Sequence, residues 1–312
     1  YQAEISQGRL ESQYNFQELV KSLTHLPLAN ASLLDESSAA GEALNLTYAY
    51  YRRKRDSFIV ADDLHPQILD VLETRSKILG VNMIVNDLSK KDRYFNELSS
   101  FAEDIDYDRV CNIMFPYPNT YGDIFIPENY IKFAKDNNIL TTGIVDLLAL
   151  TKLKSPGEIG LDIALGSSQR LAIPMWYGGP HPAFFATTEK LLRHVPGRII
   201  GKSRDSNNNE VYRLGLQTRE QHIRQQHATS NICTSQSLLT NVASFYSIYH
   251  GPKGLKRISK DINNKAIYFL TSVRCKEIVN NTFYDTITFR VNNPGRLMSL
   301  LEQNNILLRM NP

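Results

Sequence analysis

Short β-branched runs alternate with helical stretches from residue 57 to about residue 216, and this alternation constrains the fold more than any other feature. Helical patterns at residues 67–79 and 129–137 each follow a proline suited to the first turn of a helix. Strands that alternate with helices imply right-handed crossovers and a mainly parallel sheet covered on both faces. The sequence therefore predicts an α/β fold, with strands at residues 58–60, 83–85, 110–115, 140–145, 162–165, 183–187, 198–201 and 211–214.

In the last third of the chain, the regular alternation of strands and helices ends. A polar turn at residues 207–209 predicts a hairpin, and apolar residues at helical spacing predict a helix over 232–249, capped by residues 229–231. The sequence His250-Gly251-Pro252 is suited to end that helix. A further helix at about 255–275 and an alternating strand at 286–291 follow. We expect a large domain over 1–254, then a linking helix and the start of a small α+β domain over 255–312.

Two strand ends carry the residues of most chemical interest. Asp146 follows one predicted strand, and Gln169 and Arg170 form the polar tip of a strand about 25 residues later. Pyridoxal-phosphate enzymes often have this layout, with the aspartate on the pyridinium nitrogen and a lysine at the later tip. An amide is not nucleophilic and a guanidinium stays protonated, so neither residue can form a Schiff base. The sequence predicts a site that does not hold this cofactor covalently.

Composition excludes several classes of protein. The net charge of +3 is too small to indicate nucleic-acid binding, and no apolar run approaches the roughly 20 residues that span a bilayer. The cationic residues 52–55 follow a predicted helix at 37–51, where they complement the helix dipole. The cysteines Cys111, Cys233 and Cys275 are odd in number and far apart, which argues against a disulfide framework or a zinc site.

Several segments in order along the chain resemble the glycine dehydrogenase (decarboxylating) family, the P-protein of the glycine cleavage system, and specifically its amino-terminal half or the corresponding separate subunit. The resemblance spans nearly the whole chain. It is carried by residues 1–11 (YQAEISQGRLE), 29–42 (ANASLLDESSAAGE), 143–151 (GIVDLLALT), 166–181 (GSSQRLAIPMWYGGPH), 196–201 (PGRIIG) and 216–234 (LQTREQHIRQQHATSNICT).

The resemblance implies a large domain of the fold-type-I pyridoxal-phosphate transferase kind, with a mainly parallel sheet of the seven-stranded type. It also implies a parent enzyme of glycine catabolism, which decarboxylates glycine and transfers the aminomethyl group to the lipoyl group of the H-protein. In this family the carboxy-terminal half or subunit carries the Schiff-base lysine and binds the cofactor. This chain then has no catalytic residue of its own. Gln169 or Arg170 stands at the lysine position, and Asp146 is a relic of the shared fold.

The segment that would bind the cofactor phosphate supports the same interpretation. Asp35 and Glu36 stand where a helix begins, and their carboxylates can cap the free N–H groups and repel a phosphate. A lysine displaced elsewhere is the alternative. However, Lys152, Lys154, Lys190 and Lys202 all lack the desolvated setting that lowers a lysine pKa for Schiff-base chemistry.

Other polar residues are candidates for contacts with the partner half or for the edge of the active site: His181 in a glycine-rich turn, Tyr121 after a strand, and Arg219, His222 and Arg224. For His181 a turn-capping role is an equally good interpretation, and for Tyr121 a purely structural role is an equally good one. The histidines His222 and His227 are five apart, which does not favour a metal site. Residues 224–227 (RQQH) replace the family's more charged Arg-Arg-Asp/Glu-Lys pattern, which predicts a weakened contact between halves.

The expected partners are the lysine-bearing half and the lipoylated H-protein, in a homodimer or an α2β2 assembly, with no nucleic acid and no membrane. The parent works in the mitochondrial matrix if eukaryotic and in the cytoplasm if bacterial, and it is either fused or split. The chain lacks an initial methionine and stops at Pro312 after an apolar stretch, so we expect a segment of a longer polypeptide. The alternatives are a free-standing pyridoxal-phosphate lyase or transaminase with a displaced lysine, and an inactive truncated product.

Overall fold

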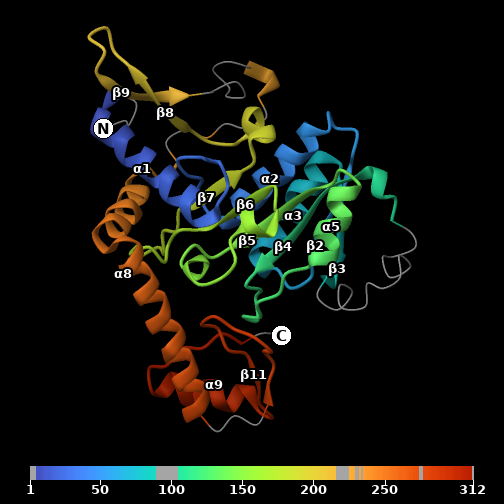
Figure 1. The fold of residues 1–312 in the computed structure, drawn as a ribbon. Coiled ribbons are helices and arrows are strands. Elements are labelled where there is room, and N and C mark those ends of the chain that lie inside the picture. The colour runs from blue at the N-terminus through green and yellow to red at the C-terminus, as the bar shows by residue number, and fades with distance from the viewer. Residues whose placement is uncertain are drawn as a thin grey trace.

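A computed structural model of the chain describes residues 5–88, 105–215, 225–228, 232, 235–273 and 277–310. It has an α/β fold around a seven-stranded sheet in the order β1-β7-β6-β5-β4-β2-β3 (Figure 1). The strands are β1 (Leu28–Ala29), β2 (Ser57–Ala61), β3 (Asn82–Asn86), β4 (Val110–Tyr117), β5 (Leu140–Val145), β6 (Ile163–Ser167), β7 (Ala183–Thr187), β8 (Ile199–Arg204), β9 (Glu210–Gly215), β10 (Glu277–Ile278) and β11 (Phe289–Arg290). The α-helices are α1 (Gln7–Thr24), α2 (Glu36–Tyr50), α3 (Pro66–Leu79), α5 (Glu128–Asp136), α6 (Pro156–Ile159), α8 (Ser237–Ser272) and α9 (Pro294–Gln303).

The sheet is mainly parallel, as the alternation of strands and helices predicts. Strands β3, β2, β4, β5 and β6 are parallel neighbours, whereas β7 runs antiparallel to β6 and β1 runs antiparallel to β7. Strands β8 and β9 form the hairpin expected around residues 207–209. The hairpin is separate from the seven-stranded sheet, which the sequence did not predict. The two-residue strand β1 was not predicted, because a run of that length carries no periodic signal. All five parallel strands end at one edge of the sheet, and this carboxyl edge is where ligands bind in such folds.

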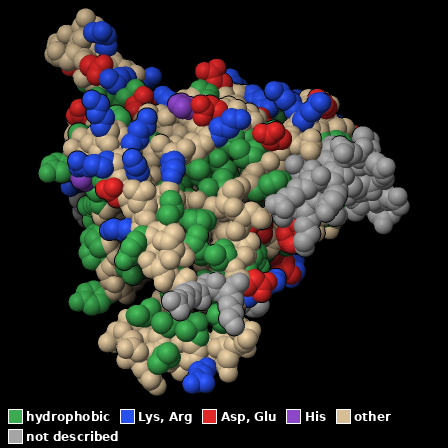
Figure 2. All heavy atoms as spheres, turned by 60° about the horizontal axis from the view of Figure 1, so that its bottom comes forward, with side chains coloured by type: hydrophobic (Ala, Val, Ile, Leu, Met, Phe, Trp, Pro, Cys, Tyr) green, Lys and Arg blue, Asp and Glu red, His purple; other side chains and the backbone are tan. Residues whose placement is uncertain are grey.

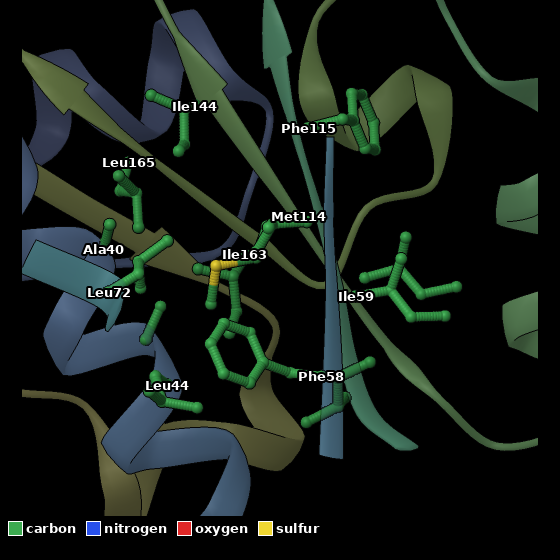
Figure 3. Packing of buried hydrophobic residues seen from close by; sticks show 14 of the residues in the cluster. Ala40, Leu44, Phe58, Ile59, Leu72, Met114, Phe115, Ile144, Ile163 and Leu165 are labelled. Carbon is green, nitrogen blue, oxygen red and sulfur yellow. The ribbon is translucent and has the colours of Figure 1, made fainter. Parts of the chain in front are cut away.

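Alternate residues of the buried strands face two different hydrophobic clusters. In β6, Ile163 and Leu165 pack in the cluster that includes α2, α3 and α5, part of which Figure 3 shows. Ala164 lies between them in sequence and packs in the second cluster, which includes α1 and the first half of α8. Because both faces of β6 are buried, its side chains are apolar at successive positions. Helices therefore cover both faces of the sheet.

The helices largely match the predicted positions. Helix α2 begins at Glu36 with Asp35 as its N-cap, and the predicted helices at 67–79 and 129–137 are α3 and α5. The prediction for the start of α8 is wrong: the helix begins at Ser237 after Gln236, and the proposed capping residues 229–231 lie outside the described residues. The break at Gly251 (φ 61°, ψ 178°) is confirmed, but a second helical stretch continues at once with Pro252 in its first turn.

The C-terminal residues 277–310 lie beside the second half of α8, away from most of the sheet (Figure 1). The strand predicted at 286–291 is much shorter than expected, since β11 is two residues long and, among the described residues, pairs with β10 alone. The residues before β11 are instead held by side-chain and loop contacts. The Thr288 hydroxyl donates to the Tyr121 carbonyl at 2.7 Å, and its N–H donates to the Asn280 side chain at 2.5 Å. These contacts replace the ladder bonds that a longer strand would make.

Charged side chains of both signs are interspersed on the face shown in Figure 2, in keeping with the small net charge. Arg55, which we expected to complement the end of the preceding helix, instead donates to the carbonyls of Val110 at 2.9 Å and Asn138 at 3.1 Å. Cys111 is a free, buried cysteine, and Cys233 and Cys275 lie outside the described residues. Among the helices that the structure describes, none is both long and apolar enough to cross a membrane.

Candidate functional site

Asp146 lies directly after β5, at the carboxyl edge of the sheet. Its Oδ1 atom accepts the backbone N–H groups of Leu148 at 2.9 Å and Ala149 at 3.3 Å, which fixes the carboxylate at the start of the next turn. Its Oδ2 atom accepts Nη1 of Arg170 at 2.6 Å. Burial raises the pKa of Asp146, while Arg170 and the two N–H groups oppose that rise. Both carboxylate oxygens are therefore engaged by the chain itself.

Gln169 and Arg170 follow β6 and point to different neighbours. The Gln169 amide donates to the carbonyl of Pro180 at 3.2 Å, so it stabilises the glycine-rich turn. The Arg170 guanidinium is the group that reaches Asp146, and its Nη2 atom also bonds the carboxylate of Asp285. Burial alone would lower the pKa of Arg170, but the two carboxylates raise it above its ordinary value. Arg170 thus stays cationic beside Asp146.

The far side of Arg170 contacts the C-terminal part of the chain. The guanidinium lies 5.5 Å from the ring centroid of Tyr284, a cation–π distance. Tyr284 is only 1% exposed, and its hydroxyl bonds Ser259 of α8 at 2.8 Å. Asn263 of α8 donates to the Tyr284 carbonyl and accepts from Lys152. The sequence did not reveal this network, because Lys152 and Arg170 are more than 100 residues from their partners Asn263 and Tyr284, and the members follow no periodic pattern.

The start of α2 carries the two acidic residues expected there. Asp35 accepts the N–H of Ser38 at 2.7 Å and so caps its own helix, as predicted. Glu36 differs from the expectation: its carboxylate turns to the end of β6 and accepts the N–H of Ser167 at 3.1 Å. Burial raises the pKa of Glu36 from 4.5 to about 7, and Asp146 and Asp35 add to the rise. Acidic side chains therefore occupy the helix start, where a cofactor phosphate would need N–H donors.

His181 and Tyr121 lie at the same edge of the sheet but do not contact Asp146 in the described interactions. The His181 ring bonds the carbonyl of Gly179, two residues earlier, which is the turn-capping arrangement. The Tyr121 side chain is 36% exposed, and its carbonyl accepts from Asn280 at 2.6 Å. Tyr121 thus takes part in the contact between the loop after β4 and the C-terminal residues.

A second polar cluster lies at the ends of β2 and β4, and sequence reasoning missed it. Asp63 accepts from the Asn119 amide at 2.7 Å, and burial raises its pKa to about 6. His65 bonds the hydroxyl of Thr120 at 2.7 Å, and burial lowers its pKa. We interpreted His65 only as a residue preceding a helix. The available signal was the position of Asp63 just after a buried strand, on the edge that carries Asp146.

Three of the predicted contact residues, Arg219, His222 and Arg224, lie outside the described residues. Three of the four alternative lysines have other partners. Lys190 pairs with Asp162 at 2.5 Å and Lys202 with Glu210 at 2.9 Å, whereas Lys152 donates to Asn263. Within the part of the chain that the structure describes, no group of three or more His, Cys, Asp or Glu side chains could hold a metal ion.

The chain is similar to known proteins over nearly its full length. The family model described as glycine cleavage system P-protein matches residues 1–311. Mitochondrial glycine dehydrogenase (decarboxylating) of Pisum sativum is 43% identical over 314 residues, covering 99% of this chain and 28% of the relative. Glycine dehydrogenase (decarboxylating) of Aliivibrio salmonicida is 46% identical over 292 residues, covering 93% of this chain and 29% of the relative.

Solved structures agree with these relatives. The crystal structure of a glycine decarboxylase (P-protein) of the glycine cleavage system, in inhibitor-bound form, superposes with a TM-score of 0.84 at 28% identity, covering 98% of this chain and 69% of that one. A C-DES mutant with glycine covalently linked to its PLP cofactor gives a TM-score of 0.63 at 9% identity, covering 98% and 79%, which shows the fold alone. The fold is that of the fold-type-I pyridoxal-phosphate enzymes, as expected. The chain spans under a third of the length of the curated relatives it matches, and it belongs to the glycine cleavage system P-protein family.

Proposed function

We propose that this chain serves as the non-catalytic, amino-terminal half of a glycine dehydrogenase (decarboxylating). The family match over residues 1–311 supports the identity of the parent enzyme. The contact between Arg170 and Asp146 at 2.6 Å carries the non-catalytic assignment. A guanidinium stands beside the relic aspartate, and a guanidinium does not form a Schiff base.

The residues at the carboxyl edge do not fit a covalently held pyridoxal phosphate. Asp146 has both oxygens engaged, and the side chains of Asp35 and Glu36 occupy the helix start where a phosphate would bind. Of the four alternative lysines, Lys152 is the one whose contacts lead toward this edge, through Asn263 and Tyr284. We therefore assign cofactor binding to the lysine-bearing half or subunit, where pyridoxal phosphate acts as an electron sink.

For the whole enzyme we propose decarboxylation of glycine and transfer of the aminomethyl group to the lipoyl arm of the H-protein, in a homodimer or an α2β2 assembly. The compartment follows the parent organism: the mitochondrial matrix in eukaryotes, as the pea relative's name suggests for that protein, or the bacterial cytoplasm. We further propose that residues 1–254 form the large domain and that residues 255–312 form the linking helix and the first part of a small domain. His181, Tyr121, Arg219, His222 and Arg224 remain our candidates for contacts with the catalytic half.

Borohydride reduction tests this function. The complete protein that contains this chain is reduced in the presence of pyridoxal phosphate, digested and mapped by mass spectrometry. We expect one stoichiometric lysine adduct, outside the 312 residues of this chain. A stoichiometric adduct on Lys152, or on any other lysine of this chain, would overturn the proposal and favour a catalytic site with a displaced lysine.

A further inference from the structure

Arg170 joins two carboxylates that are far apart in the sequence. It bonds Asp146, 24 residues before it, and Asp285, 115 residues after it. Each nitrogen at the end of the guanidinium serves a different carboxylate, so the planar group fits between them. Charge-assisted hydrogen bonds of this kind are stronger than neutral ones and are more specific in geometry. Arg170 therefore links Asp146, at the sheet edge, directly to Asp285 among the C-terminal residues.

The carboxylates are held in place independently of Arg170. Asp146 is fixed by the N–H groups of Leu148 and Ala149. Asp285 follows Tyr284, whose hydroxyl bonds Ser259 and whose carbonyl accepts from Asn263. The side chains of both aspartates are only 19% exposed. Two fixed, mostly buried carboxylates repel each other unless a cation stands between them.

In catalytic enzymes of this fold, the cation beside the corresponding aspartate is the ring nitrogen of the cofactor. Here the cation comes from the chain. We infer that Arg170 is a built-in counter-ion, which closes Asp146 to any other cationic ligand and fastens the C-terminal residues to the carboxyl edge of the sheet. This rests on the proposed function only for the identity of the ligand that is excluded. The link itself stands on the described contacts.

Chemical rescue of the full chain tests this inference. Arg170→Ala leaves two carboxylates without their cation, and we expect its melting temperature to fall by roughly 3–6 °C. Methylguanidinium chloride in the tens of millimolar should restore at least half of that loss, compared with sodium chloride at equal ionic strength. It should have no such effect on the wild type or on the double variant Asp146→Asn/Arg170→Ala. Arg290→Ala is the matched control, because Arg290 pairs with Glu277 at 2.8 Å on the exposed β10–β11 hairpin. It should lose little stability and show no rescue.

If Arg170→Ala does not fold, Arg170→Lys provides the test. Lysine keeps the charge but reaches only one carboxylate, so amide hydrogen exchange should accelerate at residues 284–288, while the strands of the sheet keep their protection. Three results would overturn the inference: an unchanged melting temperature in Arg170→Ala, rescue that persists in the double variant, or unchanged exchange in Arg170→Lys. An increase in the wild-type melting temperature with pyridoxal phosphate that disappears in Asp146→Asn would also overturn it, because Asp146 would then be open to the cofactor.

Discussion

The partly buried carboxylate of Glu36 should make the stability of this chain depend on pH in a predictable direction. Glu36 is the first residue of α2, and its carboxylate accepts the Ser167 N–H at 3.1 Å. Burial raises its pKa from 4.5 to about 7. Asp146 and Asp35 add to this rise, and the Ser167 N–H and His181 oppose it. Glu36→Gln removes the charge but keeps an amide oxygen that can accept the same N–H.

The sign follows from proton binding. Between about pH 4.5 and about pH 7, folded Glu36 holds a proton that the unfolded chain has released. Folding therefore takes up protons in this window, and the free energy of unfolding falls as the pH rises through it. A rise of about 2.5 pH units at roughly 1.4 kcal/mol each gives a cost of about 3 kcal/mol above the window. Glu36→Gln should be more stable than the wild type by up to this amount at about pH 8, and nearly equal to it at about pH 4.5.

Urea unfolding of the wild type and Glu36→Gln across this pH range measures the difference directly. Glu73→Gln is the matched control. Glu73 is an exposed carboxylate on α3 that pairs with Lys77 at 2.6 Å, so its replacement should change stability by only a few tenths of a kcal/mol at any pH. The reasoning fails if Glu36→Gln is no more stable at about pH 8, or if its gain over the wild type is the same at low pH.

Two further predictions concern the core. Gly166→Ala on β6 places a Cβ atom 2.1 Å from the carbonyl oxygen of Val145 and 3.1 Å from the Phe184 ring. It should cost roughly 3 kcal/mol or more in urea unfolding. In the control variant Gly201→Ala on β8, the added Cβ atom meets open space, so no such loss of stability is expected. Similar losses in the two variants would contradict the predicted clash at Gly166. For Cys111, burial raises the pKa of the thiol to about 12, so iodoacetamide should alkylate it only after unfolding. Rapid modification of this peptide in native buffer, seen by mass mapping, would be inconsistent with that burial.

The sequence predicted most of the sheet because strands that are buried on both faces need apolar residues at successive positions, and such runs are easy to recognise. Strands β2, β4, β5 and β7 are buried along their whole lengths, and each is rich in apolar or β-branched residues. Strands of two residues are too short to show such a pattern in the sequence. β1 has two residues and was missed, while β11 was predicted too long because residues 286–288 alternate like a strand but bind loops instead.

The candidate site was only half predictable. Asp146 and Arg170 stood out because each follows a buried strand at the same edge of the sheet, and their contact follows from that topology. Asp285 could not be found in this way, since it lies in an irregular segment whose position depends on the path of α8. The turn of Glu36 toward Ser167, rather than toward its own helix, is a choice of side-chain rotamer that the sequence does not encode locally.

The break at Gly251 divides α8 into two helical segments, and the angle between them sets the position of the second segment. From Pro252 to Ser272 the helix runs for about 30 Å, at a rise of about 1.5 Å per residue. A bend of about 10° at the break would swing the far end of this segment by about 5 Å, more than a hydrogen bond can stretch. Ser259 and Asn263, which bond Tyr284, lie roughly 10–17 Å along this part of the helix, so the same bend would move them by about 2–3 Å. Asp285 follows Tyr284 directly, so this movement would strain its contact with Arg170. The bend angle at Gly251 and the hydrogen bonds of Arg170 are therefore coupled, because a change in one would displace the other.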